Sequence, residues 1–113
     1  GCCDLYNPKV LRGSMGAVFR VKCFNVNDYS YFIDVLNKNG FVTYASVPAD
    51  DAFKINEINF NNKCAVFIGN EGNGLSKKTI CKCVKRITIP MNGRAESLNA
   101  AAAANIIMWE MVR

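Results

Sequence analysis

The sequence contains no histidine and no long hydrophobic run. The absence of histidine excludes the commonest general base and every Ser-His or Cys-His catalytic pair. The longest apolar candidate, residues 98–112, is interrupted by Asn99, Asn105 and Glu110, so no segment approaches the roughly 20 apolar residues of a membrane span. The opening GCCDLYN also lacks the charged and apolar regions of a signal peptide. We therefore expect a soluble, cytoplasmic protein whose chemistry does not depend on histidine.

Closely spaced metal ligands are also scarce. Zinc sites usually contain C-x2-C pairs, but the six cysteines include only adjacent Cys2 and Cys3 and the C-x-C at Cys81 and Cys83. We therefore expect no metal site. The cysteines could form disulfides instead, but Cys64 lies in an apolar strand pattern, where a reduced thiol acts as a small hydrophobe. Free thiols are the preferred interpretation.

Acidic residues are fewer than basic ones, which gives the chain a formal net charge of +5. A cluster of cations is either a solvated helix face or part of a nucleic-acid footprint, because phosphate binding needs several cations on one surface. The charge therefore permits an RNA partner. The local basic clusters are Lys77, Lys78, Lys82, Lys85 and Arg86.

The length of 113 residues, about half of them apolar, fits one small domain. Strand and helix patterns alternate at spacings that suit right-handed βαβ crossovers, so we predict a three-layer α/β fold around a parallel sheet. Only about three central strands can be counted, so a partner chain or a longer protein would complete the fold. The predicted elements are helices near 10–18, 28–39, 76–84 and 97–113, strands at 41–46, 64–69 and 86–90, and an irregular crossover at 50–63.

The strand pattern at 64–69, CAVFIG, is almost continuously apolar. Such a run is typical of a central parallel strand that is buried on both faces. Ligands of parallel α/β folds bind at the carboxyl ends of the strands. We therefore expect a site among the loops that follow Ser46, Ile68 and Pro90.

The stretch FIGNEGNGLS, residues 67–76, joins this strand to a glycine-rich turn that contains Glu71. Its G-x-x-G-x-G spacing differs from both the Rossmann and the Walker patterns. A carboxylate opposes the positive potential of a phosphate cradle, so the expected ligand is neutral or cationic there and offers hydroxyl or amine donors. The alternative is a tight turn in which the glycines supply positive φ and Glu71 only caps a helix.

The segment before the last helix is polar and contains Gly93. Ser97 or Glu96 can cap that helix, and Asn99 lies in its first turn, so polar side chains and free N–H groups gather at one end. The alanines at 100–104 allow close approach of other backbones. The alternative is a well-packed, alanine-rich helix without a ligand.

FIGNEGNGLS and IPMNGRAESLNAAAAANIIMWE together resemble the second and third motifs of the SpoU family of RNA 2′-O-ribose methyltransferases, in the SPOUT superfamily. NPKVLRGSMGAVFRV is similar to the family segment upstream of the second motif, so the likeness covers the whole chain. The resemblance implies S-adenosylmethionine as cofactor, rRNA or tRNA as substrate, a C-terminal trefoil knot, and a homodimer with active sites near the subunit interface. This cofactor is a sulfonium cation without phosphate, as the loop carboxylate favours.

The resemblance also assigns site residues by motif position. Glu71, Ser97 and Asn99 match the catalytic glutamate, serine and asparagine. Arg12 and Arg94 flank polar loops and are candidates for RNA contact. The expected cofactor-binding residues are Ala45, Ser46, Gly69, Asn70, Gly72, Ile89, Met91 and Leu98.

The first motif of the family, which supplies an asparagine and an arginine, has no match here. The resemblance therefore implies that residues 1–113 are a single domain, the C-terminal fragment of a SpoU-type methyltransferase lacking its N-terminal part and inactive alone. One rival is a non-catalytic RNA-binding or dimerisation module that keeps the fold, which cofactor affinity would distinguish. A Rossmann-type enzyme is disfavoured, because here the glycine loop follows a late strand and contains the acid.

Overall fold

The structure is a computed structural model that describes residues 2–93 and 98–113. Its centre is a parallel four-stranded sheet with the strand order β2-β4-β1-β3. The strands are β1 Val42–Ser46, β2 Phe53–Lys54, β3 Cys64–Ile68 and β4 Lys85–Thr88. The helices are α1 Pro8–Gly13, the 3-10 helix η1 Ala17–Phe19, α2 Tyr29–Lys38, α3 Lys77–Lys82 and α4 Ala100–Val112.

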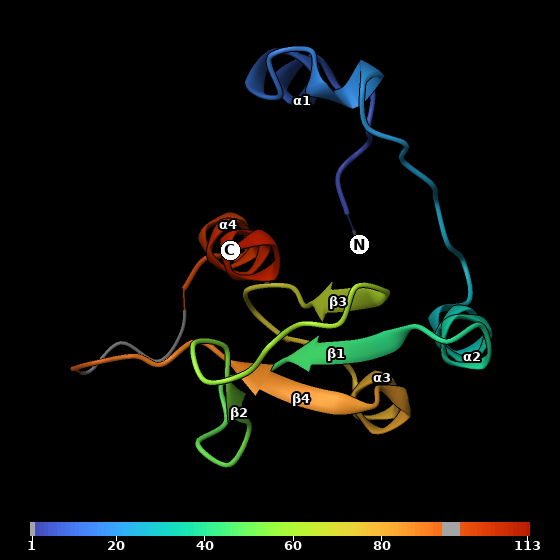
Figure 1. Ribbon diagram of the computed structural model, residues 1–113. Helices are drawn as coiled ribbons and strands as arrows, with labels where there is room; N and C mark the ends of the chain where they lie inside the picture. The colour runs from blue at the N-terminus through green and yellow to red at the C-terminus, as the bar shows by residue number, and fades with distance from the viewer. Residues whose placement is uncertain (1, 94–97) are drawn as a thin grey trace.

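Helices cover both faces of this sheet, which confirms the predicted three-layer α/β architecture (Figure 1). On one face, Ile33 of α2 packs with Ala45 and Cys83. On the other, Ile107 of α4 packs with Tyr44, and Ile55 and Ile87 complete the cluster. Each fully buried aliphatic side chain of this kind contributes on the order of 1.5–3 kcal/mol.

The central strand is β1, and the prediction that residues 64–69 form a central strand buried on both faces is wrong. β1 pairs with β3 on one side and with β4 on the other, and its Thr43 and Tyr44 are fully buried. Within the described part of the chain, β3 pairs with β1 alone, and it is half-buried throughout. An apolar run indicates that both faces of a strand can be covered, but it does not reveal whether a second strand lies beside it.

Caps and glycines set the helix boundaries. The Asp28 carboxylate accepts a hydrogen bond from the N–H of Tyr31 at 3.0 Å and so caps the start of α2. The helix predicted near 10–18 is interrupted, because Met15 and Gly16 have φ angles of 51° and 82°. These left-handed residues separate α1 from η1.

Two further boundaries differ from the expectation. The crossover at 50–63 contains β2, which lies at the edge beside β4. The last helix begins at Ala100 rather than at residue 97, because Asn99 occupies the N-cap position.

The N-terminal arm, residues 2–27, extends away from the sheet and carries α1 (Figure 1). None of its residues is buried among the residues that the structure describes. All six cysteines are free thiols, of which Cys83 is buried and Cys64 is half-buried. Within the described ranges, no helix has both the length and the apolar character to cross a membrane.

Candidate functional site

A cleft of ≈ 1110 Å³ lies at the carboxyl ends of β1, β3 and β4. Parallel strands bring the loops that follow them to the same edge of the sheet, which explains why segments far apart in the sequence meet there. Most of the lining comes from residues 46–50, 68–75, 88–93 and 98–103, and Lys54 of β2 and Ile80 of α3 complete it.

The glycine loop after β3 is closed by Asn70. Its Oδ1 accepts hydrogen bonds from the N–H groups of Gly72 at 2.6 Å and Asn73 at 3.0 Å. The N–H of Gly74 donates to the carbonyl of Asn70 at 2.8 Å, and Gly74 has a φ of 65°. A methyl group on Gly69 would lie 2.4 Å from the carbonyl carbon of Gly74. The loop therefore requires glycine at position 69 because its own backbone folds back against that residue.

Glu71 connects this loop to the last helix. Its Oε1 accepts a hydrogen bond from the N–H of Ala100, 29 residues later, at 3.2 Å. The helix that directly follows the loop, α3, has its own cap in Ser76. Glu71 thus acts on α4, where its negative charge lies at the positive end of the helix dipole. The second carboxylate oxygen still has acceptor capacity toward the cleft.

Asn99 is the N-cap of α4. Its Oδ1 accepts a hydrogen bond from the N–H of Ala102 at 2.8 Å. Glu71 and Asn99 together satisfy two of the N–H groups that a helix start leaves without intrahelical partners. The amide nitrogen of Asn99 remains a donor, and the side chain is exposed between Leu98 and Ala100, which both line the cleft.

The structure brings most of the expected site residues together. Glu71 lines the same cleft as seven of the expected cofactor-binding residues. These seven are Ser46, Gly69, Asn70, Gly72, Ile89, Met91 and Leu98.

Ala45 is the exception, and its expected place in the pocket is wrong. It is fully buried and packs against Ile33 and Cys83 under α2 and α3. Side chains alternate between the two faces along a strand, and Ala45 points into the layer of α2 and α3. Arg12 lies on α1 and is exposed outside the cleft lining. Arg94 and Ser97 lie outside the described residues.

Several cleft residues were not foreseen. Asp50 and Lys54 are the charged additions, and Asn92 adds a polar side chain. The position of Asp50, shortly after the carboxyl end of the strand at 42–46, was a usable signal. Lys54 could not be found in this way, because β2 was not recognised as a strand.

In the described residues, the charged groups that line the cleft are two carboxylates and one ammonium group, those of Asp50, Glu71 and Lys54. A phosphate site would need the opposite balance. Beside the cleft, Arg86 forms two hydrogen bonds with Asp51, at 2.7 and 3.2 Å, and holds the pKa of that carboxyl below its usual range. Among the described residues, no three His, Cys, Asp or Glu side chains are close enough to hold a metal ion.

Residues 1–109 match the SpoU rRNA Methylase family. A Staphylococcus epidermidis protein, named as a TrmH family tRNA/rRNA methyltransferase, is 36% identical over 104 residues. The match covers 92% of this chain and 41% of that relative. The chain therefore spans about two fifths of the length of the curated relatives it matches.

Solved structures share the fold over nearly the whole chain. The SpoU methyltransferase AviRb from Streptomyces viridochromogenes, in complex with the cofactor AdoMet, has a TM-score of 0.86 and 30% identity. That similarity covers 99% of this chain and 46% of AviRb. An RNA 2′-O ribose methyltransferase has the same TM-score and identity over 100% of this chain and 43% of its own.

Proposed function

Because the chain belongs to the SpoU rRNA methylase family, we propose that it is the C-terminal part of a cytoplasmic, S-adenosylmethionine-dependent enzyme that methylates a ribose 2′-hydroxyl in rRNA or tRNA. The observation that carries this proposal is the hydrogen bond from Ala100 to Glu71, which joins the glycine loop to the start of α4 at one cleft. This contact supports a single site built from the two motifs that resemble the family.

The chemistry of the cleft supports S-adenosylmethionine as the proposed cofactor. Its balance of two carboxylates to one ammonium group among the described residues suits a cationic ligand. The N–H groups of Gly72, Asn73 and Gly74 already bond to Asn70, so the carbonyl groups of the loop are the ones that would accept hydrogen bonds from ribose hydroxyls or a base amine. Ile89, Met91 and Leu98 supply apolar surface. The glycine loop, the segment from Ile89 and Leu98 would hold the cofactor.

In the proposed mechanism, bound S-adenosylmethionine supplies a methyl group attached to a positively charged sulfur. The chain's task is to hold a weakly nucleophilic ribose hydroxyl close to that methyl group and in line with it. Asn99 can donate a hydrogen bond to the ribose through its amide nitrogen, which has no hydrogen-bond partner among the described residues, while its Oδ1 caps α4. Glu71 fixes the start of α4 against the loop and so keeps Asn99 in register with the cofactor. Ser97 is proposed to orient the ribose beside Asn99.

We also propose that the fragment needs the rest of the full-length protein for activity. The relatives are more than twice as long as the matched region, and the motif-one arginine that would assist removal of the ribose proton has no counterpart in this chain. Similarity to solved SpoU structures over the whole chain supports a C-terminal trefoil knot as part of the proposed architecture.

A homodimer is the proposed assembly. Met108 and Trp109 on α4 are 54% and 68% exposed, although both are large and apolar. Such exposed apolar surface is typical of an interface. Sedimentation of the full-length protein should give a dimer, and Trp109→Asp should shift it toward monomer. A monomeric wild type would contradict this assembly.

Calorimetric titration with S-adenosylmethionine and S-adenosylhomocysteine, with ATP as control, tests the proposed cofactor site. We expect the first two ligands to bind and ATP not to bind, because the cleft carboxylates oppose a polyphosphate. The titration is made on this chain and on the full-length protein. If neither binds the first two ligands, the alternative of a non-catalytic RNA-binding or dimerisation module replaces the enzyme.

Asn99 variants separate catalysis from helix capping. Asn99→Ser keeps a capping oxygen but removes the amide donor, whereas Asn99→Ala removes both and should lower stability by about 0.5–2 kcal/mol. We expect Asn99→Ser to retain thermal stability and cofactor affinity in the full-length enzyme and to lose most methyl transfer. Wild-type methylation by Asn99→Ser would limit Asn99 to capping.

A further inference from the structure

We infer that the outer edge of β4 carries a second RNA-binding surface, formed by Phe53, Lys85 and Arg86, which holds a single-stranded segment of the substrate RNA beside the methyl-transfer cleft. We call these three residues the β4-edge surface. This inference rests on the proposed function, because it assigns part of the substrate recognition of the same enzyme.

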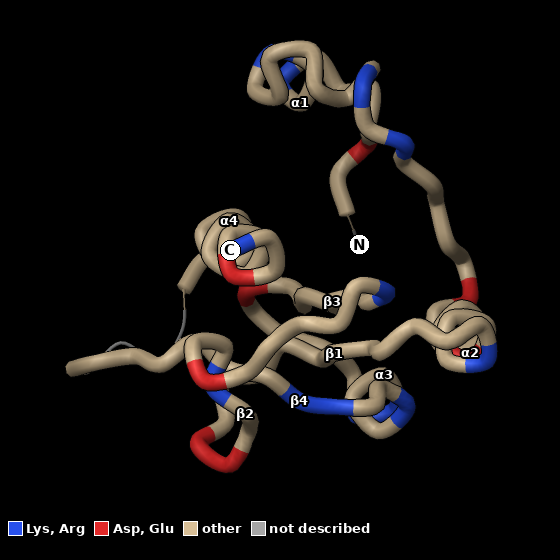
Figure 2. Tube along the Cα trace, in the orientation of Figure 1, with Lys and Arg blue, Asp and Glu red and all other residues tan. Residues whose placement is uncertain are grey.

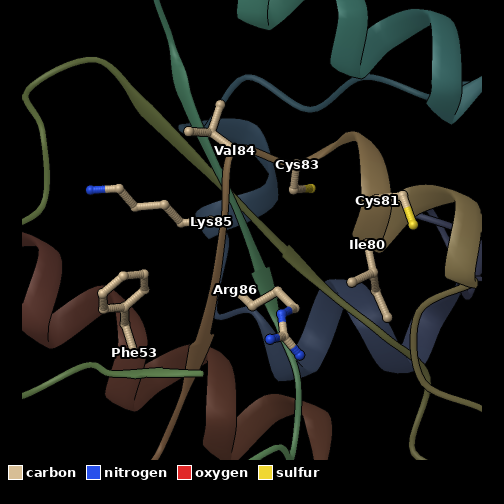
Figure 3. Close-up of a pocket in the computed structure, with 7 residues that line it drawn as sticks. All are labelled: Phe53, Ile80, Cys81, Cys83, Val84, Lys85 and Arg86. Atoms are coloured by element: carbon tan, nitrogen blue, oxygen red, sulfur yellow. The ribbon is translucent and has the colours of Figure 1, made fainter. Parts of the chain in front are cut away.

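A cavity of ≈ 480 Å³ lies at this edge (Figure 3). β2 pairs with Ile87 and Thr88, and among the residues that the structure describes no strand lies on the outer side of the first half of β4. Phe53 forms one wall and the end of α3 forms the other, with Lys85 and Arg86 between them. The cavity thus combines an open strand edge with two cationic side chains.

Phe53 has the properties of a stacking platform. It is 56% exposed although it is apolar, and the ammonium nitrogen of Lys85 lies 5.7 Å from the centre of its ring. An exposed aromatic ring beside a cation is the combination by which proteins bind single-stranded nucleic acid, with a base on the ring and a phosphate at the cation. Figure 3 shows Lys85 on the Phe53 side of β4 and Arg86 on the other side.

The charge around the cavity favours a polyanion. Residues 77–86 contain five cations and no acidic residue, and they lie on α3 and β4 (Figure 2). Two of them pair with exposed carboxylates, Lys82 with Asp34 and Arg86 with Asp51. Within the described residues, Lys85 forms no ion pair. The Asp51 side chain is 72% exposed, so solvent and salt screen its attraction for Arg86 and a phosphate group can compete for that guanidinium.

The β4-edge surface adjoins the cleft. Ile80 lines both cavities, and on β2 Lys54 lines the cleft while the preceding residue, Phe53, lines the edge cavity. Successive strand residues point to opposite faces, so β2 is the wall between the two sites. An RNA strand with its target ribose in the cleft can therefore place a neighbouring nucleotide on Phe53.

The test measures binding of a fluorescently labelled, mixed-sequence single-stranded RNA of about 12 nucleotides to the full-length protein. We expect Phe53→Ala to weaken RNA binding about tenfold. We expect Phe53→Trp to bind RNA as tightly as wild type, because a base can stack on either aromatic ring. We expect Lys85→Glu to weaken binding and to reduce the slope of log affinity against log salt by roughly one phosphate contact. Both positions are exposed, so thermal unfolding should show folded variants.

Lys63→Glu is the matched control. Lys63 also lies over a phenylalanine, Phe41, at 5.3 Å, but directly precedes β3 at the opposite end of the sheet from the cleft. Lys63→Glu changes the net charge by the same amount as Lys85→Glu and should leave RNA affinity close to wild type. Equal losses in Lys63→Glu and Lys85→Glu would overturn the inference, because net charge alone would then explain binding.

Methylation kinetics provide the second readout. Lys85→Glu should raise the KM for RNA and leave kcat and S-adenosylmethionine affinity unchanged, since the surface lies outside the cleft. If wild type binds the cofactor and methylates RNA while Phe53→Ala and Lys85→Glu behave as wild type, this inference fails and the proposed function stands. If wild type binds neither cofactor nor RNA, both fail.

Discussion

The two ends of the parallel sheet use polar side chains in opposite ways. At the amino end, the buried hydroxyl of Thr43 donates to Oδ1 of Asn37 at 2.7 Å and accepts from the N–H of Val84 at 3.0 Å. Asn37 in turn donates to the carbonyl of Lys82 at 3.0 Å. These bonds join α2, β1 and the connection from α3 to β4. Every member finds its partner inside the protein.

At the carboxyl end, the polar side chains are held in place by the protein but keep hydrogen-bonding capacity for a ligand. Glu71 and Asn99 each make one bond to the start of α4 and remain exposed. The closed network stabilises the fold, whereas the open one keeps donors and acceptors for a ligand. Substitutions at the first end should therefore change stability, and substitutions at the second should change ligand affinity as well.

Gly69→Ala should have the largest effect, because it places a methyl group where the backbone of the glycine loop packs most closely. The added methyl group meets backbone atoms of Gly74 and Leu75, which cannot move without opening the loop. We expect a loss of about 1–3 kcal/mol in the free energy of unfolding and loss of cofactor binding in calorimetry. Gly13→Ala, where no atom lies within 4 Å, is the control. Unchanged affinity in Gly69→Ala would show that the loop does not hold the cofactor.

Thr43→Val should remove the hydrogen bonds at the amino end of the sheet without affecting the cleft at its carboxyl end. It preserves shape but leaves Asn37 and the N–H of Val84 without their partner, at a cost of about 1–3 kcal/mol. Chemical denaturation should show this loss, while cofactor affinity at a temperature where the variant is folded should remain that of wild type. A parallel loss of affinity would contradict the separation of the two ends.

Glu71→Gln should have a smaller effect on stability and a distinct effect on binding. The amide oxygen of glutamine still accepts the hydrogen bond from Ala100. The substitution removes a negative charge at the start of α4, and this charge contributes about 0.3–1 kcal/mol to stability. If the carboxylate serves only α4, thermal unfolding will change slightly and cofactor affinity will not. We expect affinity for the cationic cofactor to fall and affinity for ATP to rise.

The smallest effect concerns alkaline pH. Burial raises the pKa of Cys83, beside Thr43, above its ordinary value of 9.0, so the unfolded thiol ionises first. This contribution to stability is complete below pH 9.0 and is lost as the pH rises through the higher folded value. Thiol labelling at mildly alkaline pH should therefore be much slower at Cys83 than at exposed Cys81. Equal rates would mean that the amino end opens readily.

From the sequence, the layers of the fold and the residues of the cleft were predicted better than the order of the strands in the sheet. Apolar runs and turn residues located β1, β3 and β4, and the two motifs brought Glu71 and Leu98 to one cleft. Strand order was not predictable, because β1 and β3 have similar apolar content and differ only in what pairs with them. β2 was missed because two residues carry no periodicity.

The contacts of individual side chains could not be predicted from the sequence either. Glu71 was foreseen as a site residue or the cap of a helix, but nothing local indicates a partner 29 residues away. Ala45 was misplaced because the end of a strand was taken for the pocket wall, whereas its side chain faces the core. Pattern reveals which residues a loop contains, while the direction of each side chain follows from tertiary packing.

The bond between Glu71 and Ala100 has a consequence for the order of synthesis. The glycine loop leaves the ribosome well before the helix that completes the cleft, since their bonded residues are 29 positions apart. Until α4 emerges, Glu71 has no helix to cap and the loop has no opposite wall. On the proposed function, the nascent chain therefore cannot bind its cofactor before α4 has been made and has packed against the loop.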